Sequence, residues 1–442
     1  MKPILKQDLE RLRRQIRRVK GGRMDPGGAA APRSDEHGES FSESLPYLRQ
    51  EQPGHYDAEQ VLDGEVMENQ WGRYFLSERF YPGHQRHGDF EIAKLAALPG
   101  EWLGAISRGG IPPCDPSRWA FLDTETTGLA GGTGTCAFLV GVGTIEDGGF
   151  RVRLFFMRDY DEEAAMLAAL AEFLQWRDVL ITYNGKTYDV PLLETRYRLA
   201  RKPFPFGRLH HLDLLHGARQ LWKLRMESCK LTHLECEVLG FLREGDLPGE
   251  LIPYYYFEYL RTRQAFRLVP LFHHNVMDIV TLACLTGIVL PAFASPADAD
   301  LCHGEDMLGL ARWLRRGQAH DDAGELYRRA IDSGLPDESL FRALWEKAML
   351  EKRCGRRERM LAMCRDLADV RNAYRTAALE ELAKHFEHYE KDLDQALRCT
   401  DQALDYEPSP ELRHRRNRLV RKLTQRNANQ RLEPRASTYN PR

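Results

Sequence analysis

The feature that most constrains this chain is an apolar run ending in two carboxylates and a glycine, Phe121-Leu122-Asp123-Thr124-Glu125-Thr126-Thr127-Gly128-Leu129. Side chains at positions i and i+2 of a strand share a face, so Asp123 and Glu125 are predicted to project together. Carboxylates this close repel unless a cation, a proton or solvent intervenes, and their hard oxygens suit Mg²⁺ or Mn²⁺. Because Asp-x-Glu triplets are common, a solvated strand end is the alternative.

Two downstream segments carry further acidic residues. Residues 179–191 are predicted to form a buried strand, a turn and the start of a helix, with Asp189 in the first helical turn. A carboxylate there is equally explained as a helix cap. Residues 273–282 are predicted to be helical, which places His274 and Asp278, at i and i+4, on one face. The alternative for that pair is a solvated surface contact.

Taken in order, these segments resemble the three exonuclease motifs of the DEDD (DnaQ-like) superfamily. More narrowly, five runs resemble the YprB-type ribonuclease H-like domain over residues 113–293, and upstream residues resemble the extension that precedes it. The runs are Thr124–Leu129, Tyr183–Gly185 with Tyr188–Pro191, Leu212–Leu215, Leu247–Gly249 with Ile252-Pro253, and His274-Asn275-x-x-Asp278; the upstream residues are Gly72, Tyr81–Gly83 and His84–Gly88. The resemblance implies an α/β fold, a ribonuclease H-like mixed sheet flanked by helices.

The resemblance also implies a catalytic centre. Its four acidic residues are Asp123, Glu125, Asp189 and Asp278, and together they hold two Mg²⁺ or Mn²⁺ ions for a 3′–5′ exonuclease acting on DNA or RNA. In such a centre one ion activates water and the other steadies the leaving oxygen of a phosphoryl displacement. The resemblance assigns Asp123 to both ions, Glu125 and Asp278 to one of them, and Asp189 to the other through water.

A general base that titrates near neutral pH is expected beside the last aspartate. DEDD enzymes place a tyrosine four residues, or a histidine five residues, before that aspartate. This chain has His274 at four and His273 at five. We favour His274, which precedes Asn275 in the family's His-Asn-x-x-Asp pattern, and His273 is the alternative because it has the spacing of the histidine subclass.

The residues after the first motif are predicted to contact the terminal nucleotide, as the resemblance implies. They are Thr126, Thr127, Gly128 and Leu129, and Asn184 is assigned to substrate binding with them. Gly128 would permit close approach of a strand. A plain strand-to-loop turn is the alternative.

Composition indicates a protein of two or three domains: the chain has 442 residues, 43% of them hydrophobic. Nine cysteines without a disulfide framework favour the cytoplasm, and no signal peptide or membrane span is expected. The cluster of His210, His211, His216, Cys229, His233 and Cys236 lacks paired zinc-ligand spacing, so a zinc site is not predicted. The net charge of −2 requires nucleic-acid binding to come from local basic patches.

The second half of the chain is predicted to be helical. Ala323 and Ala396, and likewise Ala330 and Ala403, are 73 residues apart, about two units of a tetratricopeptide-like (TPR-like) repeat. Such repeats would bind a protein partner; an ordinary helical bundle is the alternative, and the Arg-rich end (413–422) could instead hold phosphates. The predicted segments are a basic amphipathic helix (1–20), a flexible linker (21–60), an extension packing on the nuclease domain (61–112), the ribonuclease H-like domain (113–293), TPR-like repeats (303–425) and a disordered tail (426–442).

The sequence therefore predicts a cytoplasmic, metal-dependent nuclease with a helical-repeat region. The alternative is a non-enzymatic scaffold that binds nucleic acid or protein, chiefly through the repeats. Retention of four acidic residues and a histidine disfavours the scaffold. Endonucleolytic cutting at the same centre is a third interpretation.

Overall fold

The computed structural model describes residues 56–128 and 134–432, except the side chains of 429–432. The described residues form two compact units. The first comprises the residues up to Ala218 together with Ser228–Ala294, and the second comprises Arg219–Glu227 and the residues from Ser295 onward. The predicted basic helix, nearly all of the predicted linker and Leu129 lie outside the described residues.

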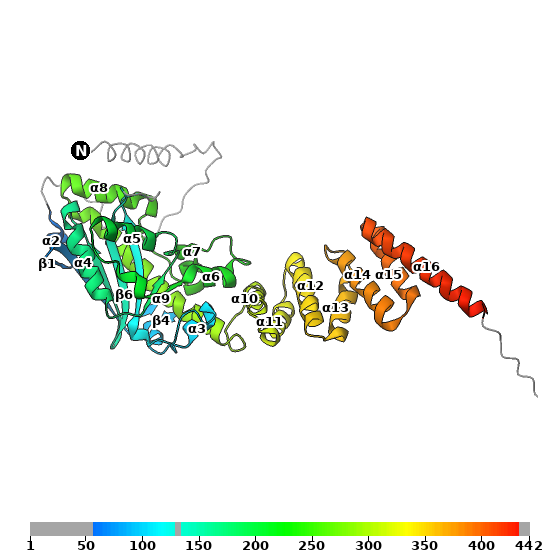
Figure 1. The fold of residues 1–442 in the computed structure, drawn as a ribbon. Coiled ribbons are helices and arrows are strands. Elements are labelled where there is room, and N and C mark those ends of the chain that lie inside the picture. The colour runs from blue at the N-terminus through cyan, green and yellow to red at the C-terminus, as the bar shows by residue number, and fades with distance from the viewer. Residues whose placement is uncertain (1–55, 129–133, 433–442) are drawn as a thin grey trace, which may run out of the picture. The chain divides into compact units, whose positions relative to one another are not determined.

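The first unit is built on a sheet of seven strands in the order β1-β2-β7-β6-β5-β8-β9 (Figure 1). The three strands β5, β8 and β9 run parallel, and every other neighbouring pair is antiparallel. The strands are β1 (Glu65–Asn69), β2 (Gly72–Pro82), β5 (Trp119–Thr126), β6 (Ala137–Glu146), β7 (Gly149–Phe156), β8 (Val179–Thr182) and β9 (His210–Asp213). This mixed sheet, flanked by helices, confirms the predicted α/β class.

The central strands are buried on both faces. In β5 the first four side chains, Trp119 to Leu122, are all 0% exposed, and all four residues of β8 are buried. Strands covered on both faces read as continuous apolar runs, which is why β5 and β8 lack polar alternation until β5 reaches Asp123. The polar residues therefore begin at the carboxyl end of β5, the end at which open α/β sheets bind ligands.

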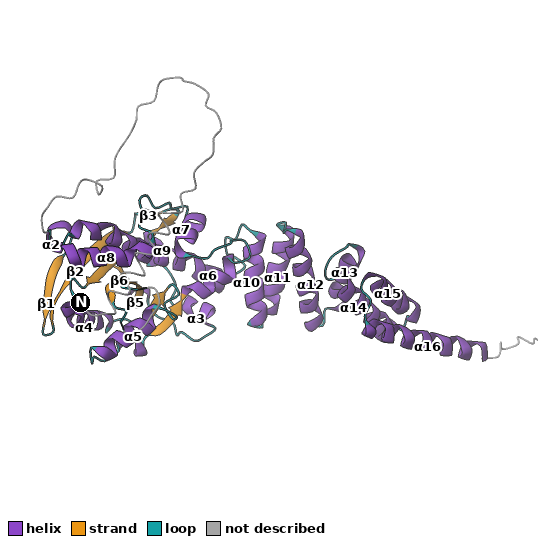
Figure 2. Ribbon diagram, turned by 90° about the horizontal axis from the view of Figure 1, so that it is seen from above, coloured by secondary structure: helices purple, strands orange, loops and turns teal. Residues whose placement is uncertain are grey.

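Helices cover both faces of this sheet, as Figures 1 and 2 show. The longest, α9 (Val269–Ala294), packs on β5, β6 and β7. The others are α2 (Ala58–Val61), α3 (Trp102–Ser107), α4 (Glu163–Leu174), α5 (Asp189–Leu199), α6 (Leu214–Trp222), α7 (Leu231–Leu239) and α8 (Ile252–Thr262), with a small β3 (Arg86–His87) and β4 (Phe90–Glu91) ribbon.

One helical segment of the described chain, Ala265–Ala294, is long and apolar enough to cross a membrane by length and composition alone. Its most apolar window is 78% buried, which is typical of the core helix of a folded domain.

The predicted extension contributes two strands to the main sheet. β1 and β2 form a hairpin, and β2 pairs with β7 from Phe75 opposite Phe156 to Pro82 opposite Gly149. His87, from β3, lies buried with its Nε2 2.9 Å from both Oε1 of Glu235 and Oγ1 of Thr281. Residues before 113 are therefore part of the same core as the strands that follow.

The second unit is helical, in agreement with the predicted helical second half (Figure 2). Ala323 and Ala330 lie on α11, Ala396 and Ala403 lie on α15, and all four are fully buried. The 73-residue spacing thus relates equivalent buried positions on two helices; assignment to the TPR class stays a prediction. The helices are α10 (Gly304–Arg316), α11 (His320–Asp332), α12 (Asp337–Arg353), α13 (Arg357–Asp369), α14 (Arg375–His385), α15 (Leu393–Tyr406) and α16 (Pro410–Leu432).

Ion pairs occupy most of the basic side chains of α16. Glu387, in a π-helical turn (Phe386–Glu390), has a fully buried side chain that pairs with Arg415 (3.0 Å), Arg418 (2.7 Å) and Lys422 (2.7 Å). Arg416 pairs with Asp401. These cations stabilise the packing of α16, which reduces the charge that the Arg-rich end could offer to phosphates.

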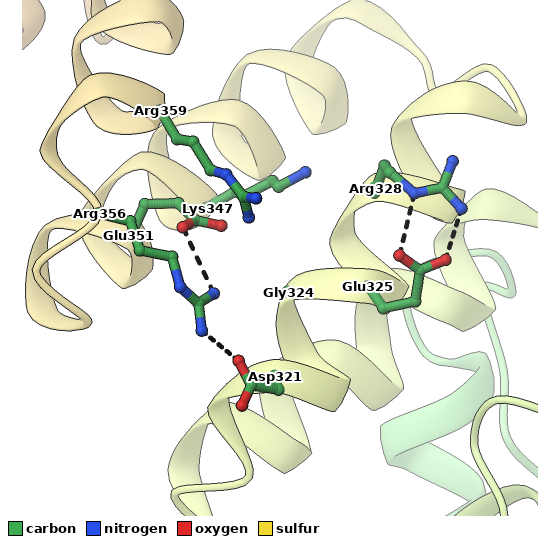
Figure 3. A pocket seen from close by; sticks show the side chains of 8 residues that line it. All are labelled: Asp321, Gly324, Glu325, Arg328, Lys347, Glu351, Arg356 and Arg359. Atoms are coloured by element: carbon green, nitrogen blue, oxygen red, sulfur yellow. Dashed lines mark hydrogen bonds and ion pairs between the residues drawn. The ribbon is translucent and has the colours of Figure 1, made fainter.

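A polar cavity of about 400 Å³ lies between α11, α12 and α13 (Figure 3). Arg356 pairs there with both Asp321 and Glu351, and Arg328 pairs with Glu325. The charges that line this cavity are therefore largely balanced by one another.

Candidate active site

Two acidic side chains of β5 face helix α9. Nδ2 of Asn275 donates a hydrogen bond of 2.8 Å to Oδ2 of Asp123. Close approach of the helix depends on Gly141, which pairs with Asp123 across the sheet. A Cβ at Gly141 would lie 2.0 Å from Oδ1 of Asn275, so only glycine leaves room for this contact.

Helix α5 begins at Asp189, as the sequence predicted for this segment. The preceding turn is held by Asp213, whose two carboxylate oxygens accept hydrogen bonds from the backbone N–H groups of Asn184 (2.8 Å) and Lys186 (3.1 Å). Asn184 takes a left-handed conformation, with φ of 67°. Oγ1 of Thr124 then donates to Oδ1 of Asp189 at 2.6 Å, which ties α5 to the end of β5.

Helix α9 places His274, rather than His273, among the acidic residues. Nδ1 of His274 donates to Oδ1 of Asp246 at 2.8 Å, and its Nε2 lies 3.5 Å from Oδ2 of Asp278. His273 is half-buried one residue earlier, and its strongest charged neighbour is Arg79. The structure therefore brings His274 together with Asp123, Glu125, Asp189 and Asp278, which influence one another electrostatically.

Burial raises the pKa values of all four carboxyl groups, and repulsion from nearby carboxylates adds to the effect. Burial raises the pKa of Glu125 to about 8 even though the charge of His274 opposes the shift, and it raises the pKa of Asp189 to about 6. The pKa of Asp123 is raised by burial and then by the charges of Asp278, Asp189 and Glu125. Burial also raises the pKa of Asp278. Such a set of carboxyl groups favours a bound cation or proton.

Burial lowers the pKa of His274, but the hydrogen bond to Asp246 and the charges of Asp278 and Glu125 outweigh it and raise that pKa to about 9. The imidazole of the metal-free protein therefore carries a proton at neutral pH. Positive charge among the carboxylates would lower this pKa, because it would cancel part of their attraction for the imidazolium.

An arginine that sequence reasoning missed also lies in the site. The guanidinium of Arg243 is 5% exposed, and it pairs with Asp278 (Nη2 to Oδ1, 2.6 Å), with Asp246 (3.3 Å) and with the buried Glu235. Arg243 and Asp246 come from the loop between α7 and α8, about 25 residues before α9 begins at Val269. No rule of sequence spacing connects that loop to α9. The only hint in the sequence is a group of three charged residues, Arg243, Glu244 and Asp246, just before the Leu247-Pro248 turn.

The oxygen donors of this site suit a divalent cation. Within the described residues, no group of three or more His, Cys, Asp or Glu side chains is placed to hold a metal ion. The chemistry nevertheless fits, because four carboxyl groups share the site, with Glu125 and Asp189 buried, and a buried oxygen, Oδ1 of Asn275, has no hydrogen-bond partner among the described residues. The guanidinium of Arg243, which pairs with Asp278, supplies part of the positive charge that a bound metal ion would supply.

The predicted substrate-contact residues follow β5 directly. Oγ1 of Thr126 donates to the carbonyl of Gly128 at 2.9 Å. Thr127 exchanges two 2.9 Å hydrogen bonds with the backbone of Cys136, which holds the strand end against β6. Among the described residues, a Cβ on Gly128 would meet only Oγ1 of Thr135, at 3.6 Å, which is ordinary van der Waals contact.

Comparison with known proteins agrees with this architecture. Residues 120–289 match the family model of the RNase_H superfamily. Over 335 residues the chain is 32% identical to the uncharacterized protein YprB of Bacillus subtilis (strain 168), covering 74% of this chain and 80% of that protein.

Among solved structures, the family B DNA polymerase from the hyperthermophilic archaeon Pyrobaculum calidifontis is matched with a TM-score of 0.32 and 16% identity. The match covers 46% of this chain and 29% of the polymerase, so this chain spans less than a third of that relative. With a ribonuclease H-like domain shown at residues 120–289 and a relative matched over most of its length, the chain belongs to the YprB family.

Proposed function

We propose that this chain is a divalent-metal-dependent nuclease, a 3′–5′ exonuclease that hydrolyses phosphodiester bonds of DNA or RNA in the cytoplasm. The observation that carries the proposal is the grouping of four carboxyl groups of raised pKa with His274 near the carboxyl end of β5. The RNase_H superfamily match over this region supports it.

Asp123, Glu125, Asp189 and Asp278 would hold two Mg²⁺ or Mn²⁺ ions. When bound, such ions activate water and neutralise charge on the phosphoryl oxygens. His274 would accept the proton of the attacking water at Nε2, while the hydrogen bond from Nδ1 to Asp246 fixes the ring. Asp246 is a positioning residue in this scheme.

The remaining residues of the site would bind the strand. Thr126, Thr127 and Gly128 would pack against the terminal nucleotide, and Leu129 and Asn184 are proposed with them. Gly128 supports this role because, among the described residues, a Cβ there would make only an ordinary contact with Thr135. The backbone N–H of Asn184 already binds Asp213, so only its side chain is proposed for the substrate.

A non-enzymatic scaffold is the second candidate function, and one observation favours it. Arg243 pairs with Asp278 where a cation would be required, and the described residues contain no ready-made metal group. In that case the TPR-like helices of the second unit would bind the partner. Endonucleolytic cutting would differ from exonucleolytic trimming in the lengths of its products, because it cuts within the strand.

The test is digestion of 5′-labelled single-stranded DNA and RNA of one sequence with Mg²⁺, Mn²⁺ or EDTA. We expect a metal-dependent ladder that shortens from the 3′ end, is absent with Asp123→Ala and is unchanged in Glu250→Ala, an exposed acidic control. Internal products would indicate an endonuclease. No cutting in any metal, with the strand still bound, would overturn the nuclease in favour of the scaffold.

A further inference from the structure

The β1–β2 hairpin ends in a two-residue loop, Gln70-Trp71, with Asn69 paired to Gly72. The Trp71 ring is 52% exposed. The loop itself is anchored, because Oδ1 of Asn69 accepts the N–H of Trp71 at 2.9 Å and its Nδ2 donates to the carbonyl of Ala165 on α4 at 3.0 Å. An exposed indole is therefore held on a fixed support.

A cation lies over this ring. Nζ of Lys202 is 3.3 Å from the centroid of the Trp71 ring, and the backbone of Lys202 is fixed by a 2.9 Å hydrogen bond to the carbonyl of Tyr197. Arg201, its neighbour, is exposed and makes no ion pair within the described part of the chain. One cation thus covers a face of the indole, and a second, exposed cation is its neighbour in the sequence.

Trp71, Arg201 and Lys202 line a cavity of about 300 Å³, together with Tyr197, Gln70 and small side chains of α4. The only carboxylate in the lining is Glu172. Lys202 covers one face of the Trp71 ring, so a base would stack on that face as the Lys202 side chain moves from the ring to the phosphate. Proteins combine aromatic rings and neighbouring cations in this way to stack a base and hold its phosphate, and the amide of Gln70 adds a polar group for a base edge.

The hairpin tip lies at the same end of the sheet as the carboxylates. Across the sheet, Phe75 is in register with Phe156, Phe156 with Leu139, and Leu139 with Glu125, and Trp71 lies beyond Phe75 at that end. Three strand spacings separate β2 from β5, roughly 14 Å in total, and the four residues from Phe75 to Trp71 add roughly 13 Å along the strand direction. The combined distance is roughly 19 Å, which about six nucleotides span at the 3.4 Å rise of a stacked strand.

We infer that the cavity between the β1–β2 loop and the end of α5 is a second subsite of the proposed nuclease, which stacks a nucleobase of a single strand on Trp71 and holds its phosphate with Arg201 and Lys202. This inference rests on the proposed function and deepens it. It assigns single-stranded nucleic acid of at least about six nucleotides as the preferred substrate.

The binding test measures the anisotropy of 5′-fluorescein DNA and RNA decamers in EDTA, where cleavage stops. We expect Trp71→Ala to weaken binding about tenfold, because stacking contributes 1–3 kcal/mol per base, and Trp71→Phe to restore most of it. Lys202→Gln should weaken binding and reduce its salt dependence. Trp176→Ala, which removes a tryptophan that is 66% exposed and does not line the cavity, is the matched control and should bind as wild type.

The cleavage test compares a decamer with a dinucleotide in Mn²⁺. For the decamer, Trp71→Ala should raise KM about tenfold without changing kcat, and both parameters for the dinucleotide should stay at wild-type values. If the wild type cuts the decamer and Trp71→Ala binds and cuts it equally well, the subsite is overturned but the nuclease is not. Trp71-dependent binding without cutting in any metal overturns the nuclease but not the subsite, and absence of both binding and cutting overturns both.

Discussion

Nη2 of Arg243 lies 2.6 Å from Oδ1 of Asp278, so a buried guanidinium pairs with a carboxylate that the sequence assigned to a metal ion. The same guanidinium pairs with Glu235, which is 1% exposed. Arg243 therefore stabilises two buried carboxylates in the protein without metal. This ion pair should therefore stabilise the folded protein and weaken the binding of a metal ion at Asp278.

Replacing Arg243 with Gln should separate these two effects. The free energy of unfolding in EDTA should fall by about 3 kcal/mol, because two buried carboxylates lose their partner. Mn²⁺ should bind about tenfold more tightly in calorimetry, because the competing cation is gone. Arg261→Gln, which alters a largely exposed arginine on α8, should change neither quantity. Weaker Mn²⁺ binding in Arg243→Gln would show that the arginine does not compete with metal.

Asp278→Asn should abolish hydrolysis while leaving strand binding largely intact, because it removes a proposed metal ligand but keeps the side chain's shape. We expect at least a 100-fold loss of kcat in a labelled-strand assay. Anisotropy with the same strand should stay within a few-fold of wild type. A variant that cuts at the wild-type rate would contradict the assignment of Asp278.

Gly141→Ala should damage the site without touching any charged group. The added Cβ would lie 2.0 Å from Oδ1 of Asn275 and force α9 away from β6, at a cost of about 1–3 kcal/mol in unfolding free energy. The hydrogen bond from Asn275 to Asp123 should be lost, and any nuclease activity with it. At Gly249 a Cβ would meet nothing within 4 Å, so Gly249→Ala is the control and should melt and cut as wild type.

Glu387 gives the second unit a pH dependence. Burial raises its pKa, but hydrogen bonds from Lys422 and Arg418 outweigh burial and hold that pKa below its usual range near 4.3. Because the folded-state pKa is the lower one, the stabilisation is complete above the unfolded-state pKa and is lost as pH falls through the folded-state pKa. Glu387→Gln should destabilise the unit by about 2 kcal/mol at pH 7.

Thermal melts from pH 7 to pH 3 check this expectation. The gap in Tm between wild type and Glu387→Gln should be constant down to about pH 5 and should close below about pH 4. Glu411→Gln, at an exposed position of α16, should track wild type throughout. A gap that widens on acidification would contradict a lowered pKa for Glu387 in the folded protein.

The sequence predicted those parts of the site that are encoded locally. Apolar runs predicted β5 and β8, and helical spacing correctly placed His274 beside Asp278. Arg243 and Asp246 were missed because their contacts depend on how the loop after α7 folds over α9. Likewise the role of Gly141 appears only once α9 crosses β6, since a glycine within a strand can equally mark a bulge or a bend.

The β1–β2 hairpin limits where the chain can be truncated without exposing an edge of the main sheet. β2 covers the outer backbone of β7 from Gly149 to Phe156, and the outermost strand β1 carries charged residues at Glu65 and Glu68. A fragment beginning at residue 113 would leave the N–H and C=O groups of β7 unpaired beside the apolar side chains of Phe150, Val152 and Leu154. Such a bare edge pairs readily with other chains, so the hairpin also protects the nuclease-like unit from aggregation.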